Sequence, residues 1–122
     1  MKTRKDPRHI ERINTIQELF AWEFSKENPI ELDSVSQIVK NLDEIDKYVE
    51  KSAPKWGVEK INRMDLAILR LAVYELMIKK DNPPKVVVDE AVEIAKEYGS
   101  DSSSSFINGA LGKLIEDQKI PT

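Results

Sequence analysis

Four basic residues near the start of the chain have the types and spacing needed to follow the phosphates of a nucleic acid. They are Arg4, Lys5, Arg8 and Arg12. In a helix of about 100° per residue, Arg8 and Arg12 share one sector with Trp22. Single-stranded RNA is bound by cations along its phosphates and by flat rings stacked on its bases. This pattern predicts RNA binding by the N-terminal region, with packing of Trp22 against the rest of the protein as the alternative.

Carboxylates repeat at three- and four-residue spacing in the segment 86–98, where they could ligate a metal ion. They are Asp89, Glu90, Glu93 and Glu97. Metal sites of this kind in helical bundles need a histidine three residues after a glutamate, and none follows here. A solvated acidic face is therefore favoured over a metal-dependent enzyme.

The serine run 102–105 offers hydroxyl groups but lacks a base to activate them, unless His9 approaches. We expect these serines to cap the following helix, where a phosphate could also bind to free amide groups.

Two charged residues interrupt an otherwise apolar segment, in which 11 of the 13 residues from Leu66 to Ile78 are apolar. They are Arg70 and Glu75. Burial of either charge is costly without a partner, and their five-residue separation places them about 140° apart on a helix, so they should not pair with each other. Two separate ion pairs are the simplest expectation, and contact of Arg70 with a ligand anion is the functional alternative.

Composition excludes several classes of protein. The chain has no cysteine and one histidine, so disulfides, thiolate sites and histidine-based triads are not expected. Its four glycines form no phosphate-binding cluster, and we expect no cofactor. No apolar run is long enough for a membrane helix, and the start of the chain does not resemble a signal peptide. A non-enzymatic cytoplasmic protein is expected.

Charge is distributed unevenly along the chain. Residues 1–12 carry five basic and two acidic side chains, and the remaining 110 residues carry 14 basic and 20 acidic ones. A basic tip on an acidic body suggests two surfaces, one for an anion and one for a basic partner.

Helical periodicity dominates the chain, and no strand pattern competes with it except at 86–88. Asp6-Pro7 should begin a first helix with the apolar stripe Ile13, Ile16, Phe20 and Phe24. Further helices are predicted over 34–51 (with Ser34 and Gln37 as a capping box), from the cap Asn62 to 78, over 86–98 up to Gly99, and from 101 or 102 to 117. The predicted fold is an all-α bundle of five to seven helices, in which an N-terminal subdomain (1–53) packs tightly against a C-terminal one (54–122).

Three sequence blocks resemble the NusB family of bacterial transcription antitermination factors. They are RMDLAILRLAVYEL at 63–76, PKVVVDEAVEIAK at 84–96 and FINGAL at 106–111. The first helix is also similar, because Arg8, Arg12, Gln17, Leu19 and Phe20 fit the arginine-rich opening of the family and its Gln-x-Leu-aromatic pattern.

The resemblance implies a helical fold that binds boxA RNA together with NusE, a basic ribosomal protein, within an antitermination complex on RNA polymerase. It implies RNA contacts by the arginines that match the family motif, by the aromatic Phe20 and by Arg70. With the basic tip, the predicted RNA-binding residues are Arg4, Lys5, Arg8, Arg12, Phe20 and Arg70. The alternative is a helical adaptor or homodimer that binds protein without direct RNA contact.

Overall fold

The computed structural model describes residues 6–122, and this part of the chain is helical with no strand. The helices are α1 (Pro7–Phe24), α2 (Asp33–Lys40), α3 (Leu42–Ser52), α4 (Arg63–Tyr74), α5 (Pro84–Tyr98) and α6 (Ser103–Asp117). A short 3-10 turn, η1 (Val58–Lys60), precedes α4, and a π-helical turn, η2 (Glu75–Lys79), continues it. The all-α prediction is confirmed, and the β-branched run at 86–88 lies within α5.

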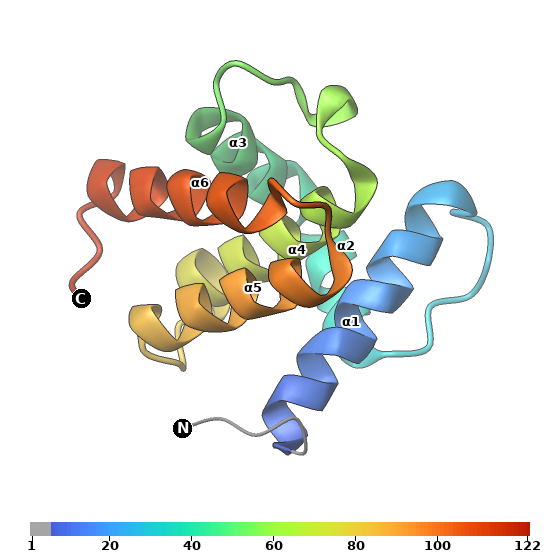
Figure 1. Cartoon of the computed structure of the whole chain (residues 1–122). Coiled ribbons are helices and arrows are strands. Elements are labelled where there is room, and N and C mark those ends of the chain that lie inside the picture. The colour runs from blue at the N-terminus through green and yellow to red at the C-terminus, as the bar shows by residue number, and fades with distance from the viewer. Residues whose placement is uncertain (1–5) are drawn as a thin grey trace.

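Helix α4 is the centre of the bundle, as its nearly continuous apolar sequence predicts. It packs against α1, α2, α3, α5 and α6. Figure 1 shows α5 and α6 side by side, with α4 behind them and α1 crossing near one end of the pair. Nine consecutive residues of α4, from Asp65 to Val73, are buried.

Two helix starts follow from local capping chemistry. Asp6 accepts a hydrogen bond from the amide of Arg8, and Pro7 occupies the first helical position. Asn62 likewise accepts from the amides of Met64 and Asp65. Both caps confirm the sequence prediction.

The predicted helix 34–51 is wrong in its length, because the chain breaks at Asn41 into α2 and α3. The predicted capping box is also absent, since α2 begins at Asp33 without a side-chain cap. Instead, the Glu18 carboxylate on α1 accepts hydrogen bonds from the amides of Glu31 and Leu32, at 2.8 and 2.9 Å. A side chain distant in sequence therefore fixes the entry into α2.

Helix α1 ends at Phe24, before the predicted stop at Asn28-Pro29. The predicted core position of Phe24 is wrong, because 65% of this residue is exposed and its ring meets Phe20 edge-on at 5.0 Å. Phe24 is the last residue of the helix.

The turn between α5 and α6 requires glycine because of close contacts, and not because of a left-handed backbone at Gly99. Its φ is −94°, and a Cβ there would lie 2.5 Å from the Ser103 hydroxyl oxygen and 2.7 Å from the Ala95 carbonyl. The buried Ser103 hydroxyl accepts a hydrogen bond from the Ser100 amide at 2.9 Å. The serine run thus serves the start of α6 through Ser103, whereas Ser102, at the cap position, forms no side-chain cap.

One apolar cluster fills the interior. It joins residues from both sides of residue 53, including Leu19 and Ile38 on one side and Leu69 and Ile107 on the other. The division into two subdomains at residue 53 stays a prediction, and the two segments share this core. In the described part of the chain, no helix has the length and apolar character needed to cross a membrane.

Candidate nucleic-acid interface

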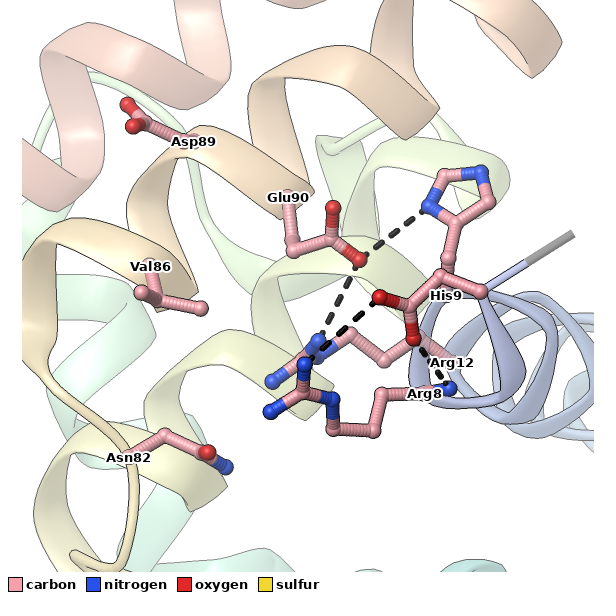
Figure 2. Close-up of a pocket in the computed structure, with 8 residues that line it drawn as sticks. Arg8, His9, Arg12, Asn82, Val86, Asp89 and Glu90 are labelled. Atoms are coloured by element: carbon pink, nitrogen blue, oxygen red, sulfur yellow. Dashed lines mark hydrogen bonds and ion pairs between the residues drawn. The ribbon is translucent and has the colours of Figure 1, made fainter. Parts of the chain in front are cut away.

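The first half of α1 borders a cavity of about 330 Å³ that residues of α5 also line. Its lining includes Arg8, His9 and Arg12 from α1, and Asp89 and Glu90 from α5. Figure 2 shows His9 and Arg12 both directed toward Glu90. The side chains of His9 and Arg12 thus meet at one carboxylate of α5.

Arg12 is buried, and its guanidinium group is held by two carboxylates. Its Nε and Nη2 donate to the two oxygens of Glu75 at 2.9 and 2.8 Å, and its Nη1 donates to Glu90 at 3.2 Å. All three side chains are at most 10% exposed. The hydrogen bonds to Glu75 raise the pKa of Arg12 above its usual value despite burial, so the group stays charged. Arg12 therefore joins α1 to η2 and α5.

His9 extends the same network. Its Nδ1 lies 3.1 Å from a Glu90 oxygen and its Nε2 lies 3.8 Å from Glu97. Glu90 is 1% exposed, so the expectation of a solvated acidic face is wrong at this residue, while Asp89 is exposed. Glu90 is thus a structural partner of α1. No group of three or more potential metal ligands occurs among residues 6–122.

Arg8 differs sharply from Arg12, although one helical turn separates them. Its side chain is 74% exposed, and its nearest carboxylate is the N-cap Asp6 at 3.6 Å. A surface ion pair of this length contributes little and leaves the guanidinium accessible to a polyanion. Arg8 is the predicted RNA contact that the described structure leaves open to solvent.

Arg70 of α4 lies in a second, partly buried network that reaches α1 and α3. Its Nε and Nη2 donate to the two oxygens of Asp46 at 3.0 Å each, and its Nη1 donates to Glu23 at 2.6 Å. Burial lowers the pKa of Arg70, but the hydrogen bonds to Asp46 and Glu23 outweigh this and raise the pKa above its usual value. The expectation of separate partners for Arg70 and Glu75 is confirmed.

The two aromatic candidates lie far from Arg8 along α1. Phe20 is half-buried against the core, and Trp22 is half-buried with the Lys26 ammonium 5.3 Å from its ring centre. Phe20 is twelve residues beyond Arg8, roughly 18 Å along the axis and on another face of the helix. A single RNA strand would have to cross α1 to contact both Arg8 and Phe20.

The six predicted RNA-binding residues therefore fall into three groups. Arg12 and Arg70 are bound by internal carboxylates, and contact of either residue with RNA stays a prediction. Arg8 is open, and Phe20 is half-buried. Arg4 and Lys5 lie outside the described residues.

Sequence reasoning missed His9, Glu75 and Glu90 as the residues that hold the arginine helix in place. Glu75 carried a signal, because a charge within an apolar helix requires a partner. Periodicity could not show that this partner is Arg12, 63 positions away.

Stability should fall in acid partly through Glu23. Burial raises the pKa of Glu23, but the hydrogen bond and charge of Arg70, with Lys26 and Arg63, lower it below the ordinary value. A carboxyl group whose pKa is lower in the folded than in the unfolded protein stabilises the fold at any pH above its unfolded-state pKa. This stabilisation is lost as the pH falls through the folded-state pKa. Urea unfolding over a pH series should show a decline beginning below about pH 4.5. The decline should be smaller in Glu23→Gln, and equal slopes for the two proteins would contradict this assignment.

Comparison with known proteins decides the family. The model of the NusB family matches residues 32–116. Transcription antitermination protein NusB of Acetivibrio thermocellus is 41% identical over 116 residues, which cover 95% of this chain and 79% of the relative. The chain belongs to the NusB family. The resemblance carried by the blocks at 63–76, 84–96 and 106–111 is thereby confirmed.

Solved NusB-family structures share this fold. NusB of T. maritima is 34% identical and superposes with a TM-score of 0.83, covering 96% of this chain and 94% of that one. A chain from a complex of the antitermination factors NusB and NusE with double-stranded RNA is 23% identical, with a TM-score of 0.77 over 92% of this chain and 99% of that one. At that lower identity the second match supports the fold alone.

Proposed function

We propose that this NusB-family chain acts in transcription antitermination by binding boxA-type RNA together with NusE, within a complex on RNA polymerase. Its 41% identity over 95% of its length to an antitermination protein carries this proposal. A chain of the same fold has been solved with NusE and double-stranded RNA, the kind of partners assigned here. We extend the proposal to a non-enzymatic role in the cytoplasm, without a cofactor, because the relatives are named for a function in transcription.

The geometry assigns different tasks to the N-terminal cations. Arg12 fixes the first turns of α1 through Glu75 and Glu90, and Arg8 projects from that fixed surface with a 74% exposed side chain. Arg8, together with Arg4 and Lys5, is proposed to contact phosphates. Phe20 remains a proposed stacking residue at the other end of the helix, and direct contacts by Arg12 and Arg70 would first require release from their carboxylates.

The salt dependence of RNA binding tests this division. Three phosphate contacts by this chain should contribute about −2 to the slope of log K against log salt, and Arg8→Ala should reduce the magnitude of the slope by roughly 0.7. The measurement is the fluorescence anisotropy of labelled boxA RNA with saturating NusE over a series of KCl concentrations. Lys47→Ala, which removes an exposed cation on α3, is the matched control and should leave the slope unchanged.

A protein-only adaptor is the second candidate, and the internal ion pairs of Arg12 and Arg70 favour it. It predicts capture of NusE that is unaffected by boxA RNA, and the same salt slope for Arg8→Ala as for the parent protein. Capture that increases with RNA, together with the slope change above, would exclude it.

A further inference from the structure

A second groove lies beside η2 and has no assigned role. It has a volume of about 350 Å³ and is formed by η2, the start of α5 and the segment after α6. Leu76, Met77, Pro84, Ile120 and Pro121 supply its apolar lining. This groove shares Asn82 with the cavity beside Arg8, so the two sites adjoin without coinciding.

Two lysines on its rim have an unusual backbone. Lys80 and Lys119 have φ of 56° and 53°, and no other non-glycine residue among 6–122 has a positive φ. Each follows a helix end, where glycine is the residue that adopts this conformation without steric cost. Lysine at both positions sacrifices some backbone stability and places a cation at the same groove. The adjoining η2 is a π-helical turn, a feature often found at functional sites.

The groove is locally basic because Lys80 and Lys119 line it, although the whole chain carries a net charge of −3. No carboxylate lines it. Within residues 6–122, neither Lys80 nor Lys119 has an ion-pair partner, whereas their neighbours Lys79 and Lys113 pair with Asp81 and Asp117. An apolar floor between two accessible cations is complementary to a ligand with both acidic and apolar groups.

We propose that this groove docks an acidic peptide segment of a protein partner, with an apolar side chain against Leu76 and Ile120 and its carboxylates at Lys80 and Lys119. RNA fits less well, because the lining contains no aromatic ring on which a base could stack. The partner is opposite in charge to the basic NusE. The docking proposal therefore does not depend on the proposed binding of RNA and NusE.

The test uses the full chain and a fluorescein-labelled peptide of alternating aspartate and leucine. We expect saturable binding, with NMR shift changes at Leu76, Met77 and Ile120, and weaker binding at higher salt. A charge-inverted peptide with lysine for aspartate should not bind, and a peptide with serine for leucine should bind more weakly. Absence of shift changes at these residues with about 1 mM acidic peptide would overturn the proposal.

Glycine substitutions separate binding from folding. The double variant Lys80→Gly/Lys119→Gly removes both charges, and glycine adopts the positive φ at each position without steric cost. The melting temperature should therefore be equal to or higher than that of the parent protein, while peptide affinity should fall roughly tenfold. Lys113→Ala on α6 is the control and should bind as the parent does. Unchanged peptide affinity in the double variant would overturn the proposal. It would also be overturned if boxA RNA, or self-association of the chain at higher concentration, shifted the NMR signals of the groove and the acidic peptide did not.

Discussion

Arg12→Ala should destabilise the protein by about 3–5 kcal/mol, one of the largest effects expected of a single substitution in this chain. The substitution removes a guanidinium that donates two hydrogen bonds to Glu75 and one to Glu90. Both carboxylates are at most 7% exposed, so water cannot readily replace Arg12. Urea unfolding at neutral pH, followed by circular dichroism, measures the loss.

Two neighbouring variants show whether this loss comes from the buried pair. Arg8→Ala, one turn away and exposed, should change the free energy of unfolding by no more than about 0.5 kcal/mol. Arg12→Lys keeps the charge but cannot form the two-pronged contact with Glu75, so it should lose less than Arg12→Ala and more than Arg8→Ala. A loss below about 1 kcal/mol in Arg12→Ala would mean that water reaches the carboxylates, and the structural role of Arg12 would be wrong.

Local chemistry explains which parts of the fold the sequence could predict. The caps Asp6 and Asn62 act on amides two or three residues away, so residue type and spacing are enough to place them. The central position of α4 follows from its nearly continuous apolar sequence. In both cases the information lies within one helix.

The errors arise where a distant group acts on the backbone. The entry into α2 is set by Glu18, 13 and 14 residues before the amides that it binds. The break at Asn41 splits an apolar periodicity that is continuous in sequence. Periodicity assigns residues to a helix face but does not report where one helix ends and the next begins.

The candidate site shows the same limit. A helical wheel places Arg8 and Arg12 about 40° apart, on one basic face. Their side chains are nevertheless 74% and 10% exposed, because η2 and α5 cover one turn of α1 and leave the other open. Which cation faces solvent is thus decided by the packing of residues more than 60 positions away.

Arg70→Met should destabilise the protein by about 3 kcal/mol, through loss of the ion pairs with Asp46 and Glu23. We expect somewhat less than for Arg12→Ala, because Asp46 and Glu23 are 21% and 15% exposed and can regain some hydration. Asp46→Asn/Arg70→Met removes both charges of the two-pronged pair and should recover part of the loss, since the cost comes mainly from Asp46, whereas Glu23 keeps its ion pairs with Lys26 and Arg63. Thermal and urea unfolding of the parent and both variants measure this, and a double variant less stable than Arg70→Met would contradict it.

Arg70→Met also distinguishes a scaffold residue from an RNA contact. If Arg70 stays bound to Asp46 and Glu23, the folded variant should bind boxA RNA with NusE as the parent does, with the same salt slope. If instead affinity falls and the slope decreases by roughly 0.7 while the protein remains folded, Arg70 contributes a phosphate contact of its own. That result would mean that RNA competes with two internal carboxylates for one guanidinium, and that α1 and α3 loosen from α4 on binding. Because Arg70 joins α4 to both helices, such loosening would appear as faster amide hydrogen exchange in α3 of the RNA complex.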